Sequence, residues 1–127
     1  MFTIYEKTES FVASGDLSLC LGRVAQLHAG SQFICELATA GENFGVLLNA
    51  PKDTEHASVV IGGITMVRVG AAVLANDYLT SAASGWAITA TVAASHQKYF
   101  GRALTNAASG MLAAVLIERG YLPNSIA

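Results

Sequence analysis

Apolar and polar side chains alternate along most of this chain with the period of two that is typical of β-strands. Turn-forming residues separate the alternating runs, as at Gly15-Asp16 and Ala83-Ser84-Gly85. The pattern predicts extended segments at residues 17–27, 33–37, 45–48, 58–61, 64–69, 78–81, 86–91, 99–104 and 111–117. Turns at intervals of roughly 8–12 residues are typical of all-β proteins. We therefore predict an all-β fold, a small β-barrel or sandwich.

The first fourteen residues differ from the rest of the chain. Their apolar side chains follow no helical period, which favours an extended N-terminal arm lying on its own domain or on a neighbour. The predicted organisation is an arm at 1–14, a β-barrel domain at 15–120 and a C-terminal tail at 121–127, which Pro123 keeps non-helical. The arm carries the apolar residues Phe2, Ile4, Tyr5 and Phe11.

The segment 104–117 is open to two interpretations. Leu104, Ala108, Met111 and Val115 recur at near-helical spacing, and alanine favours helix. Ser109-Gly110 interrupts a helix, however, and the segment echoes an earlier β-type run. We therefore predict strand here.

That echo is the strongest internal pattern in the chain. Residues 44–62 (FGVLLNAPKDTEHASVVIG) and 100–118 (FGRALTNAASGMLAAVLIE) both open on Phe-Gly and close on a run of the type Ala-x-Val-x-Ile. Six positions match clearly across the offset of 56 residues. A solenoid needs three or more repeats to bury a core. Two copies instead predict two related β-hairpins in one barrel.

Composition narrows the choice of function. Charged residues make up 13% of the chain, about half of the roughly 25% usual in soluble domains. Such a bland surface indicates that a partner covers much of it. The net charge is −2 and the basic residues are scattered, which argues against nucleic-acid binding. The apolar runs are too short to span a membrane.

The chain carries no recognisable catalytic motif. It has no Gly-x-Ser-x-Gly frame and no phosphate-binding loop. His28, His56 and His96 stand alone in predicted turns, and Asp53 and Glu55 share a polar loop. Cys20 and Cys35 match no zinc or redox spacing, so we expect buried free thiols. We predict no catalytic, cofactor-binding or metal-binding residues.

Seven short stretches, in order and at suitable spacing, resemble a known family of phage proteins. They include Gly15-Asp16-Leu17-Ser18, Leu37–Glu42, Phe44–Pro51, Val60–Val67, Gly70–Val73, Asp77–Ser81 with Gly85-Trp86-Ala87, and Gly101–Leu104. Together they resemble the capsid cement or decoration proteins of tailed phages, of the DUF2190-like kind. The first fourteen residues and the segment 92–98 show no family pattern.

The resemblance implies a structural role without catalysis or a cofactor. Such proteins are made in the host cytoplasm, bind the outside of an assembled head, and bridge subunits of the major capsid protein, often as trimers. They thereby stabilise the shell against the pressure of the packaged DNA. For the contact with the capsid or a neighbouring copy we select the residues of the arm, Phe2, Ile4, Tyr5 and Phe11. The alternative that these side chains pack on their own barrel stays open.

Two other functions remain as alternatives. One is a head-displayed β-barrel module that binds a glycan or small ligand through Trp86 and Tyr78, because aromatic rings commonly anchor such contacts. The other is a small enzyme whose site gathers one of the three histidines with a carboxylate.

Overall fold

The computed structural model describes residues 6–28, 33–91 and 98–122. They form one continuous nine-stranded sheet with a single short 3₁₀ turn, η1 (Ala83–Gly85). The predicted all-β fold is therefore confirmed. The strands are β1 (Glu6–Ala13), β2 (Val24–Leu27), β3 (Ile34–Leu37), β4 (Gly45–Leu47), β5 (His56–Arg68), β6 (Tyr78–Ser81), β7 (Ala87–Thr89), β8 (Lys98–Ala103) and β9 (Leu112–Tyr121).

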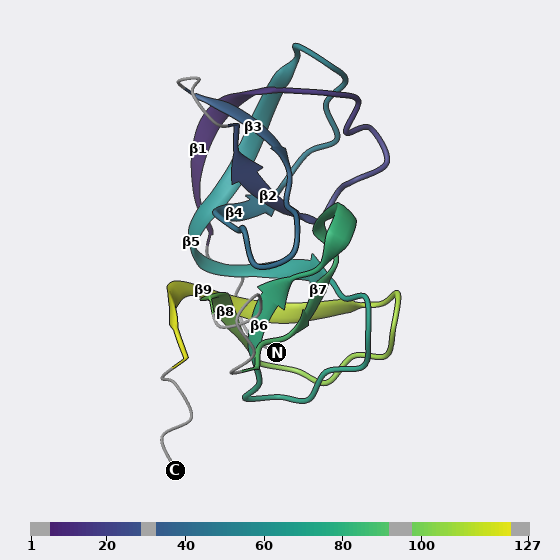
Figure 1. Cartoon of the computed structure of the whole chain (residues 1–127), viewed down its shortest axis with the longest axis vertical. Helices are drawn as coiled ribbons and strands as arrows, with labels where there is room; N and C mark the ends of the chain where they lie inside the picture. The colour runs from purple at the N-terminus through teal and green to yellow at the C-terminus, as the bar shows by residue number, and fades with distance from the viewer. Residues whose placement is uncertain (1–5, 29–32, 92–97, 123–127) are drawn as a thin grey trace.

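The first five strands close on themselves. Their order is β1-β3-β2-β4-β5, and β5 pairs back onto β1 in antiparallel register, while β1 and β3 run parallel. Closure leaves no open edge in this part of the sheet. We call these strands the N-terminal ring; they form the upper lobe in Figure 1.

The second half of the chain repeats this arrangement. The order continues β5-β9-β8-β6-β7. Val69, directly after β5, forms a parallel bridge with Ala87 of β7, and the Gly70 N–H donates to the Ala87 carbonyl at 2.7 Å. These strands form the C-terminal ring, the lower lobe in Figure 1. The 13-residue strand β5 belongs to both rings, as the last strand of one and the first of the next.

The sequence echo reflects a tandem repeat. The pair Leu47↔Val59 of β4 and β5 recurs 56 positions later as Ala103↔Val115 of β8 and β9. Loop contacts repeat as well. The Leu17 N–H donates to the Pro51 carbonyl at 2.8 Å, and the Val73 N–H donates to the Ala107 carbonyl at 2.9 Å. The prediction of two related hairpins is confirmed, although each hairpin belongs to its own ring.

Inward-facing residues fill each ring. In the N-terminal ring the cluster holds Phe11, Leu17, Leu47 and Val59, with both cysteines. In the C-terminal ring Val67, Val73, Ala103 and Val115 occupy the equivalent positions.

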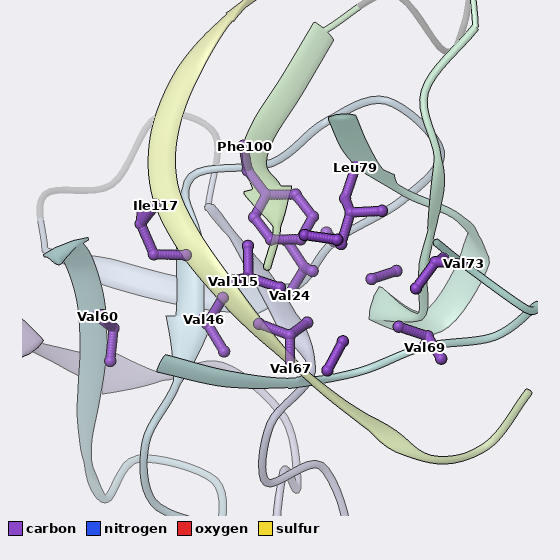
Figure 2. Packing of buried hydrophobic residues seen from close by; sticks show 14 residues of the cluster. Val24, Val46, Val60, Val67, Val69, Val73, Leu79, Phe100, Val115 and Ile117 are labelled. Carbon is purple, nitrogen blue, oxygen red and sulfur yellow. The ribbon is translucent and has the colours of Figure 1, made fainter. Parts of the chain in front are cut away.

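The two rings share a packed boundary. The core cluster of the C-terminal ring includes three residues of the N-terminal ring, Val24, Val46 and Val60. They pack in the same cluster as the fully buried Phe100 of β8. Figure 2 shows Val24 and Phe100 within this cluster. The Ser81 hydroxyl also donates to the Thr39 carbonyl at 2.7 Å across the boundary.

Several sequence-based boundaries need correction. The alternating leucines at 17–21 predicted a strand, but the segment is a loop in which Leu17 is buried and Leu19 is 89% exposed. The Cys20 N–H bonds back to the Leu17 carbonyl at 3.0 Å, a local turn that competes with ladder pairing. The runs predicted at 58–61 and 64–69 form one strand, since Gly62-Gly63 lies inside β5 beside a bulge and does not end the strand. The segment at 112–117 is strand, as predicted, but β9 continues to Tyr121.

The predicted arm is only partly covered by the described residues. Residues 6–13 are extended, as expected, but they form β1, an integral strand of the N-terminal ring. The register between β1 and β5 shifts after Lys7, opposite Gly62, which marks a β-bulge.

Candidate interaction surface

An apolar groove lies where the two rings meet. Four partly exposed side chains line it: Leu21 (51% exposed), Leu48 (38%), Met66 (37%) and Leu112 (41%). The groove encloses about 270 Å³. We call it the junction groove. Exposed apolar side chains that gather in one place on a folded domain are candidates for a contact site.

The fold itself does not demand apolar residues in this groove. On β5, Met66 points outward because its neighbour Val67 is buried in the core. In the N-terminal ring, the positions 56 residues earlier are polar: Met66 corresponds to Ser10, and Leu112 corresponds to His56. Since the same strand pairing accepts polar residues there, the apolar character here is a property of this surface.

Backbone contacts hold the groove's floor in place. The Arg68 N–H donates to the Gly22 carbonyl at 2.8 Å, and the Gly22 N–H donates to the Leu47 carbonyl at 3.0 Å. A side chain at Gly22 would contact Leu112 Cδ2 at 3.6 Å, and its φ of +82° favours glycine. The floor therefore joins a loop of one ring to a strand of the other.

Polar residues border the groove at Glu6 and Arg68. The Thr65 hydroxyl donates to Glu6 Oε2 at 2.6 Å, and Arg68 Nη1 donates to the Gly110 carbonyl at 3.0 Å. An apolar centre with a polar rim is the usual anatomy of a protein–protein contact.

The predicted contact residues are not all placed by the structure. Phe2, Ile4 and Tyr5 lie outside the described residues. Phe11 is buried, and its ring packs 5.4 Å from Phe44 and 6.0 Å from Phe33 between centroids. Phe11 therefore packs within the N-terminal ring of strands, as the alternative interpretation expected.

Trp86 and Tyr78 do not form one site, because they lie at opposite ends of the β6–β7 hairpin. Trp86 follows η1, is half-buried, and carries the Arg23 guanidinium 4.2 Å above its ring. Tyr78 begins β6 and packs against Tyr99, with 4.5 Å between ring centroids and a tilt of 43° between the rings. Each ring thus already has a partner within the chain.

The titratable residues serve local structure. His28 Nδ1 lies 2.7 Å from Glu36 Oε1, and His56 Nε2 lies 3.0 Å from the Ser58 hydroxyl; His96 is outside the described residues. Asp53 accepts the Gly15 N–H at 2.8 Å, and Glu55 accepts the Lys52 N–H at 2.7 Å. Over 6–28, 33–91 and 98–122, no three His, Cys, Asp or Glu residues gather as a metal site would require.

Both cysteines are free and buried, as predicted. Burial raises the pKa of the Cys35 thiol, which keeps it protonated and unreactive. In the same described ranges, no helix has the length and apolar character needed to cross a membrane.

Sequence reasoning missed the junction groove. Met66 and Leu112 were assigned to strands correctly, but their exposure depends on two rings meeting along β5. The one available signal was the repeat itself, since Ser10 and His56 are polar at the matching positions.

Comparison with known proteins bears on the fold. No model of a known protein family matches the sequence, and no curated protein matches it. The resemblance to the DUF2190-like family therefore stays a prediction. Among solved structures, the chain is similar to the head fiber gp8.5 N base of bacteriophage phi29, with a TM-score of 0.71 and 18% sequence identity. The match covers 94% of this chain and 100% of that one. The two-ring architecture is thus a fold already known from the base of a phage head fiber.

Proposed function

We propose that this chain is a structural protein of a phage head. The observation that carries the proposal is the match to the whole of the phi29 head fiber base, with little of either chain left over. The low charge content supports it, because 13% charged residues suits a protein whose surface is covered in an assembly.

In this role the chain is a cement protein on the outer surface of the head. The junction groove is its contact with the major capsid protein. The occupant is an apolar side chain or short segment of the shell, because leucine and methionine adapt to such a surface and exclude water from it. Many copies on one shell act together, so that a modest affinity at each groove adds up to a stable coat.

Copies of the chain also contact one another, in trimers, through surfaces outside the groove. The N-terminal residues Phe2, Ile4 and Tyr5 remain our choice for contacts with the capsid or a neighbouring copy; in the sequence they precede β1. The proposed role involves neither catalysis nor a cofactor.

The direct test uses purified full-length protein and expanded empty shells of the same phage's major capsid protein. We expect the protein to co-sediment with the shells and to raise the temperature at which they are disrupted. Intact expanded shells that neither retain the protein nor gain heat resistance would contradict the proposal.

A further inference from the structure

A second hollow lies at the far end of β8 and β9, away from the junction groove. Asn43, Lys98, Tyr99, Arg119, Gly120 and Tyr121 line it, and it encloses about 360 Å³. In the antiparallel ladder Lys98 is paired with Tyr121 and Tyr99 with Gly120. The hollow is thus built mainly on two paired strands, whose register shifts between Tyr99 and Gly101, with Asn43 from the loop before β4.

Aromatic rings form two sides of the hollow. Tyr99 lies directly over Gly120, since a Cβ at position 120 would come within 2.6 Å of its ring. Tyr121 is 66% exposed, which is unusual for so large a ring on a strand. Tyrosine presents an apolar face together with a polar tip, so these two rings suit a ligand that is both.

Cations stand beside the rings. Lys98 Nζ lies 5.9 Å from the centroid of the Tyr121 ring and 3.7 Å from Glu42 Oε1. The Arg119 guanidinium lies 5.0 Å from the centroid of the Phe44 ring. Arginine and lysine form strong charge-assisted hydrogen bonds with carboxylates and phosphates. A ligand in this hollow is therefore met by two positive groups and by the exposed ring of Tyr121, while Tyr99, packed between Gly120 and Tyr78, forms the wall behind it.

The repeat indicates that the fold does not require this set. Across the offset of 56 positions, Lys98, Tyr99, Arg119 and Tyr121 correspond to Glu42, Asn43, Gly63 and Thr65. The N-terminal ring closes without aromatic or basic residues there. The concentration of Tyr, Lys and Arg is thus specific to one end of the molecule.

We propose that this hollow binds a saccharide that carries an anionic group. The exposed face of Tyr121 packs on the C–H face of the sugar, and Lys98 and Arg119 pair with its carboxylate or phosphate. Specificity arises from the few polar groups placed around an apolar floor. Binding in this hollow is independent of shell attachment, which we assign to the junction groove.

The test is an NMR titration of the full-length protein with three probes: 3′-sialyllactose for a carboxylate, a glycerol-phosphate-substituted saccharide for a phosphate, and lactose as the neutral reference. We expect at least one anionic probe to bind tenfold or more tightly than lactose. Whichever probe binds identifies the anion. If neither anionic probe shifts resonances at millimolar concentration, or if lactose binds equally well, the proposal fails.

Matched variants separate this site from general attraction. We expect Arg119→Gln and Tyr121→Ala each to weaken binding at least fivefold, whereas Tyr121→Phe retains it. Lys52→Gln, which removes an exposed cation in the loop after β4, leaves binding unchanged. Equal weakening by Lys52→Gln would overturn the proposal, and so would unaffected binding in an Arg119→Gln protein whose thermal unfolding matches the parent.

Discussion

Gly45 and Gly101 occupy the same place in the two rings, 56 residues apart. A Cβ on Gly45 would lie 2.5 Å from the Val60 carbonyl oxygen, and a Cβ on Gly101 would lie 2.6 Å from the Leu116 carbonyl oxygen. The Cγ1 atom of the preceding residue, Val59 in one ring and Val115 in the other, would lie equally close to the added Cβ. Two strands therefore approach within a distance that only glycine permits.

We expect Gly45→Ala and Gly101→Ala to destabilise the protein by similar amounts, about 1–3 kcal/mol each, because the backbone must shift to admit the methyl group. Denaturant unfolding measures the loss. Gly62→Ala is the matched control within β5, since its Cβ would meet Lys7 at an ordinary 3.5 Å. Equal stability of all three variants would show that the close approach has no energetic weight.

The shared boundary predicts that the two rings unfold together. Trp86 is the one tryptophan and lies in the C-terminal ring, while Cys20 and Cys35 are buried in the N-terminal ring. Because Val46 packs in the same cluster as Phe100, neither ring keeps its core when the other opens. We expect the fluorescence of Trp86 and the reactivity of the thiols to change at the same denaturant concentration. Thiols that react well before the fluorescence changes would mean that the rings are independent.

The packed boundary between the rings also predicts how much stability one substitution removes. Phe100→Ala removes a fully buried ring, and we expect a loss of about 3–5 kcal/mol. The unfolding midpoints measured by Trp86 fluorescence and by thiol reactivity should fall by the same amount. A shift confined to the fluorescence of Trp86 would place the effect in one ring only.

Glu36 predicts a dependence of stability on pH. The hydrogen bond from His28, and then that from Gln26, lowers the pKa of Glu36 below its ordinary 4.5. Its contribution is therefore present above pH 4.5 and is lost as the pH falls through the lowered pKa of the folded state. We expect Glu36→Gln to flatten the fall in unfolding free energy below pH 4.5. An unchanged slope would show that other carboxylates cause it.

Much of the fold follows from local pattern. The strand around Cys35 was predictable because its alternation matches burial on one face of a closed sheet. The strands around Val46 and Leu79 are short runs bounded by turns, and nearly all of their residues are buried. The leucines at 17–21 misled, because their alternation does not reveal that Leu17 turns inward on a hydrogen bond to Pro51. The two-ring closure needed knowledge of long-range pairing, such as Phe11 with Ala57, that no local window contains.

The candidate surface was less predictable. The exposed apolar residues at Met66 and Leu112 have the same local pattern as core positions, and only the junction of two rings separates them from the core. The aromatic arm residue Phe11 was assigned to contact, but its place opposite Ala57 on β5 directs it inward. The identity of the partner and the position on a shell depend on a second protein, so a local pattern in one chain does not contain them.

The most direct measurement is co-sedimentation of expanded shells with the parent protein, Leu112→Glu and Val12→Glu. Leu112 lines the junction groove at 41% exposure, whereas Val12 is 43% exposed at the opposite end of β1 from Glu6. A charge in the apolar groove must be desolvated on docking, so we expect Leu112→Glu to lower the shell-bound fraction at least tenfold. We expect Val12→Glu to bind as the parent does. Full binding of a folded Leu112→Glu protein would contradict the assignment of the groove as the contact with the head.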